Sequence, residues 1–174
     1  MDISKIKINF ISCLLLITIF IPVSAFSDDD LFFGIGVGED GISAARLSKE
    51  YDKGTLFDTT INKSAEIGVN YWDGDKENST SKSTSFSITY SGILSKTFDN
   101  NFFLSSGMGL ALLSDDKIGD RNLGTSLQFE SRLGFGYKTV NTSSSLNIFH
   151  YSNAGTASDN SGVNILMINL SHLF

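Results

Sequence analysis

Hydrophobic and polar residues alternate along most of the chain after residue 30, so that apolar side chains recur at every second position. The clearest stretch is 127–138, where one face of an extended segment carries Leu127, Phe129, Leu133, Phe135 and Tyr137 and the other carries Gln128, Glu130, Arg132 and Lys138. Successive side chains of a β-strand point to opposite faces. This period of two therefore predicts strands and not helices.

The same alternation predicts seven further strands. They lie at residues 31–38, 42–51, 66–72, 85–94, 102–112, 144–152 and 163–171. An even number of strands of about 10 residues, each with one apolar face and one small or polar face, is typical of an outer-membrane barrel. A soluble sandwich alternates similarly, but its strands are usually about 5–6 residues long. The predicted fold class is all-β: an eight-stranded antiparallel transmembrane β-barrel with up-and-down topology.

The connections between these strands alternate in length. Short turns are predicted at 99–100 and 139–143, and longer polar connections at 73–82, 114–124 and 153–163. Such barrels have short periplasmic turns and longer extracellular loops, so the three longer connections are predicted to be extracellular. The connection at 52–63 is long for a periplasmic turn and does not fit this scheme.

The N-terminus has the layout of a secretory signal peptide. Lys5 and Lys7 precede an apolar run at 10–21, and small residues lead to a predicted cleavage site after Ala25. The run is short for a membrane anchor, which needs about 20 residues. The predicted organisation is a signal peptide at 1–25 and an outer-membrane barrel domain at 26–174. The terminal Phe174 resembles the C-terminal signature of outer-membrane proteins.

Composition narrows the chemistry of the exported chain. The single cysteine, Cys13, and the single proline, Pro22, both lie in the predicted signal peptide. Disulfides, cysteine nucleophiles and cysteine metal sites are therefore excluded. The absence of proline suits a closed barrel in which backbone N–H groups must pair. The net charge of −6, without a basic cluster, argues against nucleic acid as a partner.

Polar side chains occur on the apolar face at one end of the last hairpin. Asn147 is polar in the middle of its strand, so the opposite face is predicted to contact lipid, and that face includes His150 and Ser152. The two residues would lie about 6.5–7 Å apart along the strand. Asn164 shares the outward face of the last strand and lies across the hairpin from them. The alternative is that His150, Ser152 and Asn164 lie at the membrane interface and take no part in a reaction.

The segment Phe149-His150-Tyr151-Ser152-Asn153-Ala154-Gly155, followed by Asn160-Ser161-Gly162-Val163-Asn164, resembles the signature of the lipid A 3-O-deacylase (acyloxyacyl hydrolase) family. The resemblance covers about 16 residues directly. Family members are eight-stranded outer-membrane barrels that hydrolyse the ester-linked 3-hydroxyacyl chain at position 3 of lipid A. By this resemblance Ser152 is the nucleophile and His150 the general base, while Asn153 and the backbone amide of Gly155 are oxyanion donors.

One position departs from the family pattern. The third member of the triad, a Glu in the best-known pattern, falls on Asn164. An Asn oxygen can accept the imidazole N–H bond but brings no charge, and loss of the acid from a serine triad can cost about 10⁴ in rate. Asp159, in the preceding loop, is an alternative acid.

The resemblance implies a carboxylic ester hydrolase in the outer membrane of a Gram-negative bacterium, without cofactor or metal. Its expected partner is lipid A or lipopolysaccharide in the outer leaflet, and a homodimer is left open. A non-catalytic barrel for adhesion, surface protection or membrane integrity is the alternative from another class. A soluble ligand-binding barrel in the periplasm is a third.

Overall fold

The structure, a computed structural model, describes residues 31–57, 59–75 and 82–172. The predicted signal peptide with its cleavage site, and Phe174, lie outside these residues. Among the described residues no helix is long and apolar enough to cross a membrane.

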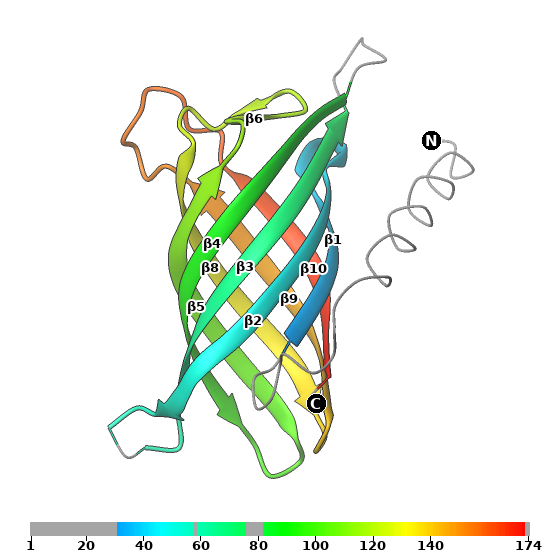
Figure 1. Ribbon diagram of the computed structural model, residues 1–174, viewed down its shortest axis with the longest axis vertical. Coiled ribbons are helices and arrows are strands. Elements are labelled where there is room, and N and C mark those ends of the chain that lie inside the picture. Colours follow the sequence, from blue (N-terminus) through cyan, green and yellow to red (C-terminus); the bar gives the residue numbers. More distant parts are fainter. Residues whose placement is uncertain (1–30, 58, 76–81, 173–174) are drawn as a thin grey trace, which may run out of the picture.

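Eight strands form one closed antiparallel barrel, as Figure 1 shows. They are β1 (Leu31–Gly38), β2 (Ser43–Thr55), β3 (Asn62–Asp75), β4 (Lys82–Thr97), β5 (Phe102–Leu113), β8 (Leu127–Lys138), β9 (Thr142–Ser152) and β10 (Val163–His172). Each strand pairs with its neighbours along the chain, and β1 pairs with β10, from Leu31 opposite His172 to Gly38 opposite Ile165. Closure leaves no unpaired sheet edge. The predicted fold class is confirmed.

The apolar face of the sheet lies outside and the polar face inside. Outward residues such as Leu133, Ile148 and Leu170 are 68%, 55% and 55% exposed, whereas the inward Glu66 and Glu130 are each 1% exposed. This arrangement is the reverse of a soluble protein and matches a barrel surrounded by hydrocarbon. The alternation in the sequence therefore assigned the faces correctly.

Side chains fill one half of the interior, so the barrel is not an open channel. Near one end, a buried apolar cluster forms from Trp72, Ile118, Leu123, Phe149, Tyr151 and Val163 with their neighbours. Below it lies a network of charged side chains centred on Arg46, which is 2% exposed. Arg46 pairs with Glu66 and Glu130, and Glu66 also pairs with Arg132.

Two connections differ from the sequence-based expectation. Half of the long connection predicted at 52–63 is strand: β2 runs to Thr55 and β3 begins at Asn62, with an irregular register between Tyr51 and Gly54. Asp52 at this bulge has φ 51°, and the extra residues hide the alternation. The connection predicted at 114–124 contains a small hairpin of β6 (Lys117–Ile118) and β7 (Arg121–Asn122).

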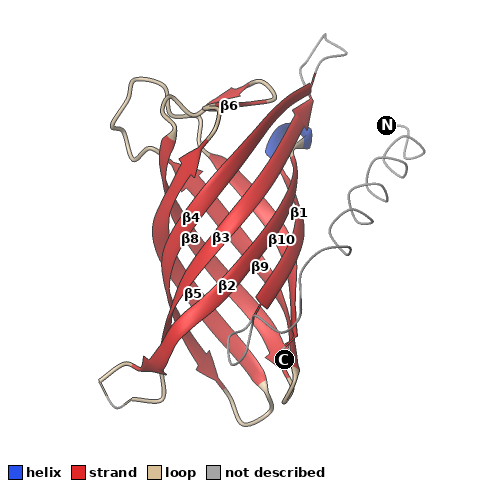
Figure 2. Ribbon diagram, viewed as in Figure 1, coloured by secondary structure: helices blue, strands red, loops and turns tan. Residues whose placement is uncertain are grey.

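The short helix η2 (Glu39–Gly41) joins β1 to β2. Figure 2 shows η2 and the β6 hairpin at the same end of the barrel, where the connection between β9 and β10 also lies. Three connections therefore lie at the end of the barrel where β9 ends and β10 begins.

Candidate active site

Strand β9 places His150 and Ser152 on the outer wall of the barrel. The alternate residues Phe149 and Tyr151 point inward and are 0% and 2% exposed, while Leu146 and Ile148 are exposed on the outside. His150 and Ser152 continue that outward row and are half-buried. Their outward orientation, predicted from the sequence, is the one observed.

Asn164 lies directly opposite His150 in the pairing of β10 with β9. The two side chains are hydrogen-bonded, with 2.9 Å between His150 Nδ1 and Asn164 Oδ1. An amide oxygen only accepts hydrogen bonds, so Nδ1 carries the hydrogen in this arrangement. The lone pair of the imidazole is then on Nε2, the nitrogen that a general base uses.

Ser152 lies two residues beyond His150 and opposite Phe129 of β8. Within the described part of the chain, no hydrogen bond joins Ser152 to His150. Gly162 packs over both residues, since a Cβ added there would lie 3.3 Å from His150 Cε1 and 3.9 Å from Ser152 Cβ. Catalytic hydrogen bonds are often long in substrate-free enzymes and tighten in the complex.

The side chain of Asn153 organises the connection between β9 and β10. It is fully buried, its amide donates to the backbone oxygens of Leu123 (2.9 Å) and Asp159 (2.6 Å), and its oxygen accepts the backbone N–H of Gly155 (2.8 Å). The Asn153 amide and the Gly155 backbone N–H, both expected to be oxyanion donors, therefore already donate to other protein atoms. A substrate oxygen would have to replace these partners.

A tight turn follows the candidate nucleophile. The backbone N–H of Thr156 donates to the oxygen of Asn153 at 3.1 Å, and the central residues Ala154 and Gly155 have φ of 53° and 79°. Such left-handed conformations are uncommon for a residue with a Cβ and cost about 1–3 kcal/mol. Ala154 adopts this conformation two residues after Ser152, at the point where the chain turns away from β9.

Asp159, the alternative acid, does not contact His150. Its carboxylate accepts a hydrogen bond from the Asn122 side chain at 2.7 Å. This contact connects the β9–β10 loop to the β6–β7 hairpin. Asp159 thus supports the loop and not the imidazole.

A carboxylate that the sequence analysis did not identify approaches the site from η2. The Asn164 amide donates to Glu39 Oε1 at 3.0 Å, so that Glu39, Asn164 and His150 form a continuous chain of hydrogen bonds. Glu39 is 125 positions from Asn164. The pairing of β1 with β10 brings it there, because Glu39 follows Gly38, which pairs with Ile165, the residue after Asn164. No local sequence pattern identifies this residue.

Arg121 of β7 fixes Glu39 in this position. Its guanidinium lies 3.1 Å from the Glu39 carboxylate and 2.7 Å from Asp40, and it donates to the backbone oxygen of Gly162 at 2.7 Å. The hydrogen bond from Asn164 lowers the pKa of Glu39, burial partly opposes this, and the charge of Arg121 lowers the pKa further. Glu39 is therefore ionised at neutral pH.

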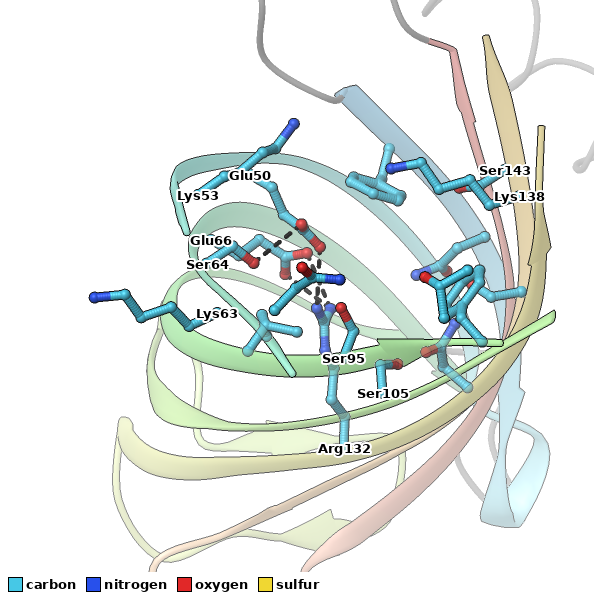
Figure 3. A pocket seen from close by; sticks show the side chains of 18 of the residues that line it. Glu50, Lys53, Lys63, Ser64, Glu66, Ser95, Ser105, Arg132, Lys138 and Ser143 are labelled. Carbon is cyan, nitrogen blue, oxygen red and sulfur yellow. Dashed lines mark hydrogen bonds and ion pairs between the residues drawn. The ribbon is translucent and has the colours of Figure 1, made fainter. Parts of the chain in front are cut away.

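The site lies on the outer wall of the barrel, away from the interior cavity. The cavity in Figure 3, of about 430 Å³, lies inside the opposite half of the barrel and is lined by polar residues including Glu50, Lys63, Glu66 and Arg132. His150, Ser152 and Asn164 do not line it. Among the described residues, no group of His, Cys, Asp and Glu side chains is arranged to hold a metal ion.

Comparisons of this chain with a family model and with two known proteins indicate the same family. The model of the family described as Lipid A 3-O-deacylase (PagL) matches residues 42–172. The chain is 37% identical to Lipid A deacylase PagL of Pseudomonas aeruginosa over 100 residues, which are 56% of this chain and 57% of that protein. It is 24% identical to Lipid A deacylase PagL of Bordetella bronchiseptica over 137 residues, 74% of this chain and 76% of that protein.

A solved structure, described as the crystal structure of the outer membrane enzyme PagL, has the same fold. It superposes with a TM-score of 0.71 at 26% identity and covers 82% of this chain and 97% of that chain. The alignment to the Pseudomonas protein spans less than two thirds of that protein's length, at 57%. The structural match extends over nearly the whole solved chain.

Proposed function

This chain belongs to the lipid A 3-O-deacylase (PagL) family of outer-membrane β-barrels, and we propose that it is an ester hydrolase that removes the 3-hydroxyacyl chain linked at position 3 of lipid A. The observation that carries the proposal is the 2.9 Å bond between His150 and Asn164, on the outer wall beside Ser152. It leaves Nε2 of the imidazole free to act as a base, and Ser152 lies two residues further along the same outer face, which is the combination that activation of a serine requires.

The first half of the reaction transfers the acyl chain to the protein. His150 Nε2 takes the proton of the Ser152 hydroxyl as Oγ forms a bond to the ester carbon. The tetrahedral intermediate then collapses, the bond from carbon to the lipid A 3-oxygen breaks, and His150 returns the proton to that oxygen. Lipid A leaves with a free 3-hydroxyl, and the acyl group remains on Ser152.

The second half releases the fatty acid. His150 takes a proton from a water molecule, the water oxygen attacks the acyl carbon, and collapse of the second intermediate returns the proton to Ser152. Asn153 and the backbone amide of Gly155 are proposed to stabilise the negative oxygen of both intermediates. They would exchange their partners in the loop for the substrate oxygen, which couples loop rearrangement to substrate binding.

The outer surface explains how such a substrate would arrive. Ile148 and Leu166 border the site on the same face and are 55% and 44% exposed. An acyl chain in the outer leaflet can lie along these residues without leaving the hydrocarbon, so no pocket is required. Ester hydrolysis by Ser and His needs no cofactor. A homodimer stays a prediction.

Mass spectrometry of lipid A from cells that express the full chain tests the proposal. We expect wild type to remove one 3-hydroxyacyl chain and Ser152→Ala to leave lipid A intact. Ser131→Ala is the matched control, because Ser131 lies directly opposite His150 on the same outer face. Loss of activity in Ser131→Ala but not in Ser152→Ala would overturn the assignment of the nucleophile. Intact lipid A with folded wild type would favour a non-catalytic barrel.

A further inference from the structure

We propose that Glu39 is the missing acid of this site, a positioning residue that acts on His150 through Asn164. The inference rests on the proposed function of Ser152 and His150 and deepens it. The family model matches residues 42–172 and so does not include Glu39. The structure assigns the role that a directly bonded carboxylate has in a serine triad to two residues, an amide and a carboxylate behind it.

The hydrogen-bond polarity of the chain supports this role. A carboxylate only accepts hydrogen bonds, so Glu39 requires the NH₂ end of the Asn164 amide to face it. The oxygen end must then face His150, where it can only accept, and Nδ1 must carry the hydrogen. Without Glu39 the amide could turn over, and its NH₂ group would then hold the imidazole in the wrong tautomer.

The charge of Glu39 adds to this effect. When His150 accepts the serine proton, the imidazolium is stabilised by negative charge nearby, which Asn164 alone does not bring. Glu39 is one hydrogen-bonded residue further away, and the hydrogen bond from Asn164 lowers its pKa, so that it is ionised at neutral pH.

Arg121 makes Glu39 a fixed part of the site. The Glu39 side chain is 44% exposed, and an exposed Glu would ordinarily sample many rotamers. The guanidinium holds its second oxygen at 3.1 Å and simultaneously binds the backbone oxygens of Ser161 and Gly162. Because Gly162 packs on the His150 ring, the same arginine connects the acid to the loop above the base.

The first test measures hydrolysis of lipid A by purified protein in detergent. We expect Glu39→Gln to lower kcat about 10- to 100-fold with little change in KM, less than the about 10⁴-fold loss from a directly bonded acid. Asp40→Asn is the matched control, since Asp40 pairs with the same arginine but does not contact Asn164. Equal losses in the two variants would overturn the proposal.

The second test places a carboxylate at position 164, next to His150. In Asn164→Glu the carboxylate contacts His150 directly, so Glu39 should no longer be needed. We expect Glu39→Gln to change kcat by less than about 2-fold in that background, a non-additivity that a merely structural role does not produce. A loss of the same size in both backgrounds would contradict the relay.

The third test does not depend on activity. The sequence has two histidines, His150 and His172, so ¹⁵N-histidine labelling with His172→Gln leaves a single imidazole to observe. We expect the Nδ1–H tautomer in wild type, a reduced population of it in Glu39→Gln, and no change in Asp40→Asn. An unchanged tautomer in Glu39→Gln overturns the relay. Wild type that has the expected tautomer but does not hydrolyse lipid A overturns only the proposed function.

Discussion

The barrel contains two hydrogen-bonded clusters built around carboxylates, one in its interior and one on its outer wall, and they differ in redundancy. Inside, Arg46 donates to Asn70, Thr89, Tyr151 and both Glu66 and Glu130. Glu130 in turn also accepts bonds from Ser91 and Tyr151. Each charged group there has several partners, so the loss of one bond would not turn any side chain around.

In the outer cluster, the hydrogen bonds connect one residue to the next in series. His150 is joined to Asn164 by one bond, and Asn164 to Glu39 by one bond. The direction of each bond determines the next, so the cluster transmits a choice of tautomer where the inner cluster only neutralises charge. Multiple partners stabilise the inner cluster, whereas single bonds in series let the outer cluster determine the tautomer of His150. Substitutions in the inner cluster should therefore change the free energy of unfolding, and substitutions in the outer cluster should change the rate of hydrolysis.

The largest effect is expected for His150→Ala. Loss of the base should lower the rate of lipid A hydrolysis by about 10⁴-fold or more, equivalent to about 5.5 kcal/mol in the barrier. The free energy of unfolding should change little, because His150 makes one hydrogen bond at the surface of the barrel. Rate assays and urea unfolding of the same preparation measure both. A decrease in the free energy of unfolding as large as the increase in the barrier of hydrolysis would contradict the different roles of the two clusters.

Arg46→Met should lower the free energy of unfolding and leave the rate of hydrolysis nearly unchanged. It leaves Glu130 buried without its cation, which typically costs about 3–5 kcal/mol in the free energy of unfolding, while the rate per folded molecule stays close to wild type. The only tryptophan, Trp72, is fully buried with its ring 4.8 Å from Tyr151, so its fluorescence reports unfolding. Lys96→Met, which removes an exposed charge, is the control and should change stability by less than about 0.5 kcal/mol.

A smaller effect is expected for Gly162→Ala. The new Cβ would press on His150 Cε1 at 3.3 Å, and we expect about a 10-fold lower rate, or about 1.4 kcal/mol, from displacement of the ring. Gly41→Ala is the matched control, with a similar backbone (φ 74° against 58°) but a nearest atom at 3.9 Å. Similar rate losses in both variants would assign the effect to backbone strain and not to the imidazole contact.

The sequence predicted the barrel because lipid and interior impose opposite chemistry on alternate residues of every strand. The alternation fails where the pairing itself is irregular, at the bulge between Tyr51 and Gly54, and there the ends of β2 and β3 were missed. The two-residue strands β6 and β7 are too short to carry a periodic signal.

Prediction of the site was limited by distance along the chain. His150, Ser152 and Asn164 lie on one hairpin, so alternation and a local resemblance were enough to place them on one face. Glu39 and Arg121 reach the site from two other connections, and neither belongs to a local pattern. The engagement of Asn153 with Leu123 likewise depends on a contact 30 residues away, which no spacing rule reveals.

The seam between β1 and β10 has a consequence for when the protein can act. Glu39 follows the first strand and Asn164 belongs to the last, so the relay is assembled only when the two ends of the sheet meet. A chain that has formed the β9–β10 hairpin but has not closed holds the serine and the histidine without their acid. Under the proposed relay, closure of the barrel therefore completes the site, and a chain that has not closed is expected to hydrolyse lipid A more slowly.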